Sequence, residues 1–187
     1  HTKKLLLIAN NDSKKQYSSY YSNEEIVASW RNRIERVLRE KSDVEVIFKL
    51  HPAWNTQDEF EGLGVGGNLR VLHGGDMEEL IKVTSVLVVR HSMAALDGII
   101  QGVPTVSINT PPVPAGNFYK EVGGTIHANN DDEFISIISS LMDEDSSMLE
   151  LFEQRRSDFI QDCLGVDMSG QGVDAKMRFV QLLNELA

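Results

Sequence analysis

Residues 86–109 read VLVVRHSMAALDGIIQGVPTVSIN. An apolar run ends at Arg90, a helix that is apolar nearly all round follows, and Gly102 ends that helix before a second apolar run. The pattern predicts strand, turn, helix and strand, with the helix buried. Ser92 stands at the N-cap position, where backbone N–H groups point into the turn, and Asp97 is the only charge in the helix. We therefore expect this turn to bind an anion and the helix to face a polar ligand.

Strands and helices alternate through the rest of the chain. Apolar runs predict strands over residues 3–9, 44–48, 69–72 and 125–127, and helical spacing predicts helices over residues 22–41, from 76, over 130–141, over 147–163 and from 174 onward. This alternation predicts an α/β fold with a doubly wound parallel sheet, Rossmann-like, in the order 3-2-1-4-5-6. We expect one domain over residues 3–187, with His1 and Thr2 as vector-derived residues at the start of a piece of a longer protein.

Composition excludes several classes of function. The formal net charge of -10 argues against a nucleic-acid-binding surface, which needs clustered Lys and Arg. The single cysteine, Cys163, excludes an internal disulfide and favours a reducing, cytoplasmic setting. Since no apolar run reaches membrane-spanning length, we expect no membrane span.

Polar residues follow the predicted strands at the edge where such a sheet binds ligands. The expected crevice lies where the strand order reverses, and it brings together two turns. These turns contain Asn10, Asn11, Asp12 and Ser13 after the first strand, and Arg90, His91 and Ser92 after the fourth. Four histidines also stand at strand ends, namely His51, His73, His91 and His127. The alternative is that strand ends are loops, which are polar anyway; we favour it for His127, favour a functional role for His51 and His91, and leave His73 open.

Several chemistries lack their motifs. No His–Cys or His–Glu spacing typical of a zinc site occurs, so no metal site is expected. Ser92 lacks the flanking glycines of a hydrolase nucleophile, and the first strand does not end in a dinucleotide-binding glycine pattern. The interpretation that remains is phosphate binding at the helix N-terminus. Positive charge would come from Arg90, Lys49 or His51, and Asp97 would accept hydrogen bonds from a ribose. The alternatives are a plain N-cap for Ser92 and a structural acid for Asp97.

The same residues resemble a known family. Residues 92–106 resemble the small-x-x-Leu-acid-Ala/Gly-x-x-x-Gly-x-Pro signature in the C-terminal, nucleotide-binding domain of GT-B glycosyltransferases. The segments 49–52 (KLHP) and 76–80 (DMEEL) match motifs of the polysaccharide and CDP-glycerol transferase-like branch. The resemblance therefore implies that the chain is one half of a GT-B architecture.

The resemblance also implies roles for individual residues. The donor's diphosphate would be held by Ser92, Met93 and Ala94 together with Arg90 and Lys49. The ribose would be held by Asp97, which is a glutamate in most relatives. The base would be contacted by His73, Gly74 and Gly75, and the catalytic residue would be His51. Met93 departs from the small hydroxyl residue often found at its position. The Ser-Gly-Gly turn of UDP-N-acetylglucosamine 2-epimerases, which share the fold, is absent.

The implied function is donor binding in a glycosyltransferase or polyol-phosphate transferase of surface polysaccharide synthesis. The donor would be a nucleotide-sugar or a CDP-polyol, with no cofactor and no obligatory metal. The acceptor would bind an N-terminal domain, through which the full-length protein could associate peripherally with a membrane, and the isolated domain would be inactive. A sugar-nucleotide 2-epimerase and a non-catalytic nucleotide-binding or scaffold module remain as alternatives.

Overall fold

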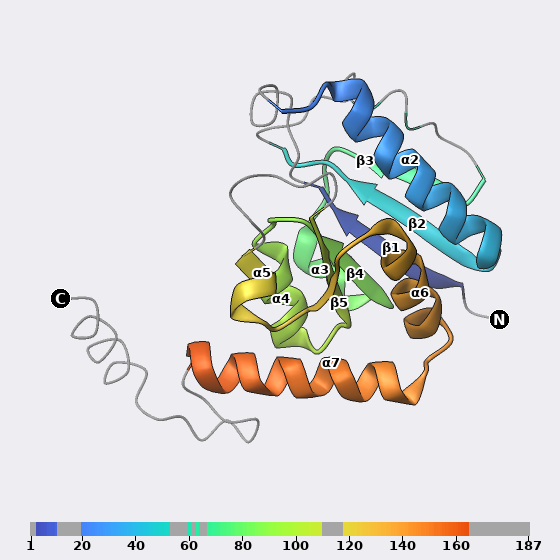
Figure 1. Cartoon of the computed structure of the whole chain (residues 1–187). Coiled ribbons are helices and arrows are strands. Elements are labelled where there is room, and N and C mark those ends of the chain that lie inside the picture. Colours follow the sequence, from blue (N-terminus) through green and yellow to red (C-terminus); the bar gives the residue numbers. More distant parts are fainter. Residues whose placement is uncertain are drawn as a thin grey trace.

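Six short apolar segments pair side by side into one parallel sheet (Figure 1). The computed structural model describes residues 3–10, 20–52, 60, 63, 67–109 and 118–164. The strands are β1 (Lys4–Ala9), β2 (Val44–Lys49), β3 (Leu69–Leu72), β4 (Val86–Val89), β5 (Thr105–Ile108) and β6 (Ile126–Ala128). Their order is β3-β2-β1-β4-β5-β6 and every neighbouring pair is parallel, which confirms the predicted doubly wound topology.

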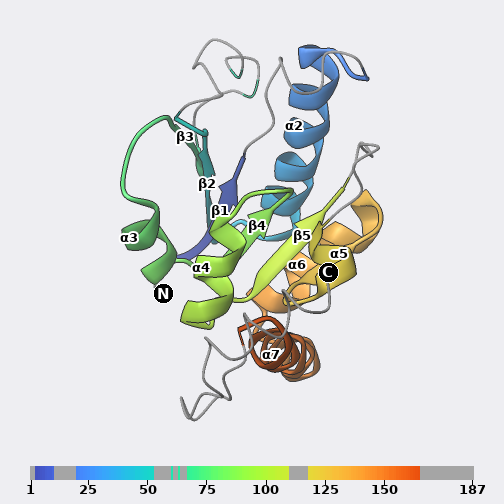
Figure 2. The same ribbon diagram turned by 90° about the vertical axis from the view of Figure 1, so that its left-hand side faces the viewer.

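Helices cover both faces of this sheet. They are α2 (Asn23–Glu40), α3 (Met77–Lys82), α4 (Ala94–Gln101), α5 (Phe118–Val122), α6 (Asp131–Met142) and α7 (Ser146–Phe159), and α7 continues into the π-helical turn η2 (Ile160–Leu164). In Figure 2 the sheet is seen between α3 and α4 on one side and α2 and α6 on the other. Both faces are thus buried, as the continuous apolar composition of the strands predicts.

The core divides into two layers because successive strand residues point to opposite faces. Leu6, Ile8 and Phe48 belong to the layer beneath α2 and α6, whereas Leu7 and Leu87 belong to the layer beneath α3 and α4. A third, smaller cluster joins α4 to α7 and η2 through Ile99, Phe159 and Ile160.

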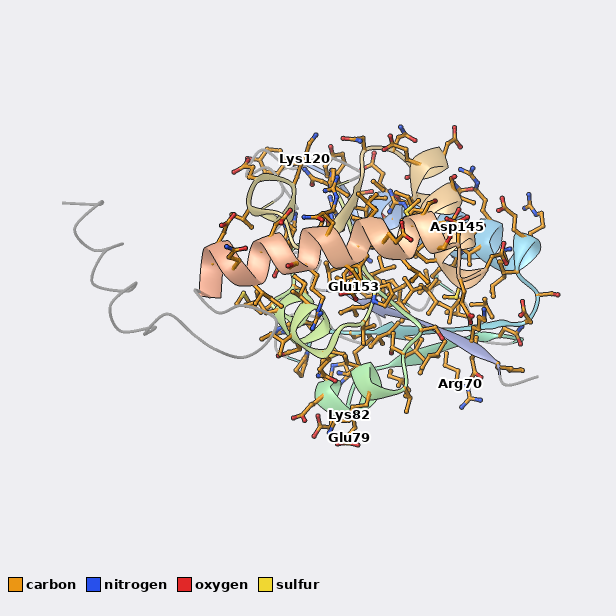
Figure 3. All side chains as sticks on the ribbon, turned by 90° about the horizontal axis from the view of Figure 1, so that it is seen from below. Arg70, Glu79, Lys82, Lys120, Asp145 and Glu153 are labelled. Atoms are coloured by element: carbon orange, nitrogen blue, oxygen red, sulfur yellow. The ribbon has the colours of Figure 1, made fainter. Side chains whose placement is uncertain are left out.

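Side-chain caps fix where most helices begin. Ser22 and Glu25 form the predicted capping box of α2, and Asp76 and Asn130 accept backbone N–H bonds at the starts of α3 and α6. Asp145 caps α7 in the same way and lies at one end of that helix in Figure 3. Figure 3 also shows Glu79 and Lys82 together on α3, where they form an exposed ion pair of 2.7 Å.

Three expectations need comment. The prediction that the helix after β4 is wholly buried is wrong, because Met93, Asp97, Ile100 and Gln101 form an exposed stripe along α4. The helix α5 was not predicted, since only five residues form it after a proline-rich segment. The predicted turn residues Asn11, Asp12 and Ser13, and the predicted helix from residue 174 onward, lie outside the described residues.

Candidate functional site

The carboxyl ends of the strands form one row across the sheet. Adjacent strands align Leu72 with Lys49, Lys49 with Ala9, Ala9 with Val89, Val89 with Ser107 and Ser107 with His127. The segments that follow these residues therefore leave the sheet at one edge. Asn10 follows β1 and is buried, and its backbone N–H donates to the carbonyl of Lys49 at 2.9 Å. Since β1 pairs directly with β4, Asn10 and Arg90 stand at the point where the strand order reverses.

The turn between β4 and α4 is held by Ser92. Its Oγ accepts a hydrogen bond from the N–H of Ala94 at 3.3 Å, and its carbonyl accepts one from the N–H of Ala95 at 3.2 Å. The N-cap position is Met93, which makes no side-chain cap bond, so the prediction that Ser92 is the N-cap is wrong by one residue, although the Ser92 Oγ accepts from the first N–H of the helix. Among the described residues, nothing accepts a hydrogen bond from the N–H of Ser92 or of Met93. Two backbone donors are therefore available at this turn.

Two cations lie at the same edge of the sheet. Arg90 is 1% exposed and Lys49 is 4% exposed, and the Lys49 Nζ donates to the carbonyl of Leu50 at 3.3 Å. Burial lowers the pKa of Lys49. His51 is half-buried two residues further on, and burial together with the positive charge of Lys49 lowers the pKa of its imidazole. His51 is accordingly neutral at pH 7, the form in which an imidazole can accept a proton.

Asp97 lies on the exposed stripe of α4, one turn beyond Met93. Its carboxylate is close enough to Tyr119, on α5, to affect that residue electrostatically. The pKa of Tyr119 rises to about 12, chiefly through burial and further through the negative charge of Asp97. The Tyr119 hydroxyl donates to the carbonyl of Ser92 at 2.9 Å. Sequence reasoning missed Tyr119, because nothing in a five-residue helix indicates contact with a turn 27 residues earlier.

The loop His73–Gly75 is exposed and stands apart from the α4 turn. It follows β3, the edge strand, which β2 and β1 separate from β4. Gly75 has a φ of 95°, a left-handed conformation that favours glycine, and it leads into the Asp76 cap of α3. Because α3 packs beside α4, the loop lies on the same side of the sheet as the exposed stripe.

The other two histidines have different surroundings. His91 is half-buried within the turn itself. The Nδ1 of His127 is 3.0 Å from the Ser107 hydroxyl, which lies 2.8 Å from the hydroxyl of Thr125, and both of these hydroxyl residues are fully buried. Burial and then the nearby Lys120, which is labelled in Figure 3, lower the pKa of His127. His127 itself is half-buried, and the structural interpretation that we favour for it stays a prediction.

Neither a metal cluster nor a membrane-crossing helix occurs among the described residues. No three His, Cys, Asp or Glu side chains in that part of the chain are placed to hold a metal ion. The helices described there are all too short or too polar to cross a bilayer.

Comparison with known proteins gives matches at the level of structure. No protein-family model matches the sequence. No curated protein matches it either. Among solved structures, the wall teichoic acid polymerase TagF is 11% identical, with a TM-score of 0.63 over 100% of this chain and 46% of its own. The S. aureus TarM complex with fondaparinux, alpha-GlcNAc-glycerol and UDP is 13% identical, with a TM-score of 0.59 over 98% of this chain and 35% of the TarM chain. A putative UDP-N-acetylglucosamine 2-epimerase from Listeria monocytogenes is 11% identical, with a TM-score of 0.60 over 84% of this chain and 42% of the epimerase chain.

These matches identify the architecture. The fold is Rossmann-like and matches one half of these GT-B structures. Transferases and an epimerase share this GT-B half, so the likeness by itself establishes the fold and no particular activity. The chain spans less than half the length of each of the three proteins.

Proposed function

We propose that the chain is the donor-binding half of a GT-B glycosyltransferase or polyol-phosphate transferase that uses a nucleotide-activated donor in surface polysaccharide synthesis. The observation that carries this proposal is the position of the turn from Arg90 to Ala95. This turn leads into α4 from the end of β4, at the point where the strand order of the sheet reverses. Open N–H groups and the positive end of a helix dipole suit a diphosphate. The GT-B neighbours support it further, since one is a wall teichoic acid polymerase and another is a complex with UDP.

In this proposal the diphosphate is held mainly by backbone. Ser92 and Met93 contribute their open N–H groups, and the small side chain of Ala94 lets the ligand approach closely. Arg90 and Lys49 contribute positive charge at the same edge of the sheet. These groups neutralise the diphosphate, so the proposal needs no obligatory metal and no cofactor.

The remaining roles follow from where the side chains stand. Asp97 is exposed one turn into α4, where its carboxylate can accept hydrogen bonds from a ribose. His51, neutral through its lowered pKa, is the catalytic group that exchanges a proton near the transferred group. The loop of His73, Gly74 and Gly75 contacts the base, and Asn10 and His91 line the crevice.

A second half of the GT-B architecture would complete the proposed enzyme. Because the chain spans less than half of the GT-B proteins that it resembles, we propose that an acceptor-binding domain lies in the remainder of the full-length protein. That domain would also provide any peripheral association with a membrane. The chain alone is then expected to bind the donor and not to turn it over.

Calorimetric titration with UDP, CDP and GDP tests the proposal. One of these nucleotides should bind, and its 2′-deoxy form should bind less tightly because Asp97 loses a ribose partner. Asp97→Ala should remove that difference, which amounts to about tenfold for a hydrogen bond to a charged group. Gln101→Ala, on the same exposed stripe, should preserve it. No binding of any diphosphate at millimolar concentration would refute the proposal.

A 2-epimerase is the second candidate, and the likeness to the Listeria monocytogenes protein favours it. Incubating the full-length protein with UDP-N-acetylglucosamine and an acceptor separates the two activities. An epimerase inverts C2 and leaves the nucleotide attached, whereas a transferase releases the nucleotide. Nucleotide binding with no product from UDP-N-acetylglucosamine and none from a CDP-polyol would indicate a non-catalytic nucleotide-binding module.

A further inference from the structure

We infer that Tyr119 is a positioning residue for the proposed diphosphate site: from α5 its hydroxyl holds the Ser92 carbonyl and thereby aims the N–H of Met93 at the phosphate. This inference rests on the proposed function. It adds a residue that has no motif of its own and lies 27 positions beyond the turn.

The first step is the geometry of one peptide group. The carbonyl of Ser92 and the N–H of Met93 belong to the same planar, trans peptide unit, so they point in opposite directions. The Tyr119 hydroxyl donates to that carbonyl at 2.9 Å, and the N–H of Ala95 donates to it at 3.2 Å. Two donors on the carbonyl leave the peptide little freedom to rotate. The direction of the Met93 N–H is therefore fixed from the opposite side.

The second step is polarisation. A hydrogen bond accepted by a carbonyl makes the N–H of the same peptide a stronger donor, because the bonds in such a chain polarise one another. Tyr119 is 2% exposed, so water does not compete for its hydroxyl. The bond thus strengthens the donor that the diphosphate would use.

The third step is the state of the hydroxyl. Burial and the carboxylate of Asp97 raise the pKa of Tyr119 to about 12, so the phenol keeps its proton at every pH at which the protein would act. The same carboxylate is the proposed ribose ligand. Tyr119 is accordingly a common neighbour of the diphosphate turn and of Asp97, and it connects the two parts of the proposed site.

Tyr119→Phe tests the inference, because it removes the hydroxyl and keeps the buried ring. The Ser92 carbonyl retains its bond from Ala95, so the variant should fold. We expect its affinity for the preferred nucleoside diphosphate, and for inorganic pyrophosphate, to fall by about three- to tenfold, as for the loss of one hydrogen bond. Tyr20→Phe, at a tyrosine that is 57% exposed, is the matched control and should bind like the wild type.

Titrations should run well below the melting temperature of every variant, with the amide resonance of Met93 followed by NMR. A purely structural Tyr119 would lower the melting temperature but leave the affinities of the folded protein, and the change in the Met93 shift on adding pyrophosphate, as in the wild type, which overturns the inference. If the wild type binds a diphosphate and Tyr119→Phe binds it equally well, the inference alone fails. If the wild type binds none, the proposed function fails and the inference with it.

Discussion

Replacing Gly98 with alanine should destabilise the protein, although alanine is the better helix former. Gly98 lies in the middle of α4, at the point where that helix touches the sheet. A Cβ at this position would lie 2.6 Å from Cδ2 of Leu87 and 2.6 Å from Oγ1 of Thr105. Both distances are far shorter than a van der Waals contact, so either the side chains or the helix must move.

The magnitude follows from two opposing effects. Alanine favours the helix by about 1 kcal/mol relative to glycine. Overpacking a close-packed interior costs about 1–3 kcal/mol. Relaxation is difficult here, because Leu87 and Thr105 are fully buried and the Thr105 hydroxyl is bonded to the carbonyl of Val103 at 2.8 Å. We therefore place the overpacking cost at its upper end and expect a net loss of about 1–2 kcal/mol.

Thermal unfolding followed by circular dichroism measures this loss. For a chain of this size the melting temperature should fall by about 2–8 °C. Gly74→Ala is the control, since a Cβ there meets nothing within 4 Å, and the free energy of unfolding should stay equal or rise slightly. A Gly98→Ala protein as stable as the wild type would refute the conclusion that α4 is seated on the sheet through this glycine.

Substitutions at three further ionisable groups, with one control, test the site and the stability of the fold. Lys49→Met should leave the free energy of unfolding equal or raise it, because an apolar chain replaces a cation that is 4% exposed. The same variant should bind the diphosphate about tenfold more weakly in calorimetry. Equal or tighter binding would show that Lys49 does not contact the diphosphate. The imidazole of His51 has a lower pKa in the folded protein than in the unfolded chain, so the free energy of unfolding falls as the pH drops from 6.5 through that lowered pKa. His51→Gln should make this fall smaller in urea unfolding measured at several pH values. An unchanged pH profile would contradict the argument. Asp131→Ala should lower the free energy of unfolding by about 2–3 kcal/mol, because it breaks the 2.8 Å ion pair with the buried Arg33. Asp132→Ala breaks an exposed ion pair and should lower it by only about 0–1 kcal/mol. Equal losses in the two variants would contradict the argument from burial.

Most of the fold could be predicted because its signals are local. A capping box at Ser22 and single caps at Asp76 and Asn130 mark helix starts through bonds that span two or three residues. Strands buried on both faces appear as unbroken apolar runs, and the alternation of strands with helices limits the topology to a few choices. The exposed stripe of α4 was not predicted, since the side chains of Met93 and Ile100 are apolar and yet 67% and 55% exposed.

The candidate site was predicted only where strand ends determine it. The register of the sheet brings Asn10, Lys49 and Arg90 to one edge, and this follows from strand order alone. The roles proposed for His51 and for the loop at His73 stay predictions, because they depend on a bound donor. Tyr119 could not be found from the sequence, since its contact with Ser92 depends on where a five-residue helix packs.

The way α4 is held explains why the donors of the proposed diphosphate turn cannot be recognised from its side chains alone. Its proposed donors are backbone N–H groups, which every residue except proline possesses, so the side chains of the turn need only be small or turned away. What must be specific lies elsewhere: Gly98 lets the helix approach the sheet, Arg156 on α7 donates to the carbonyls of Ile99 and Ile100 at the far end of α4, and Tyr119 holds the peptide at its start. The sheet thus fixes α4 at its middle, and two helices distant in sequence, α7 and α5, fix its two ends. Substitutions at these supporting positions should therefore weaken diphosphate binding even where no residue of the turn is changed.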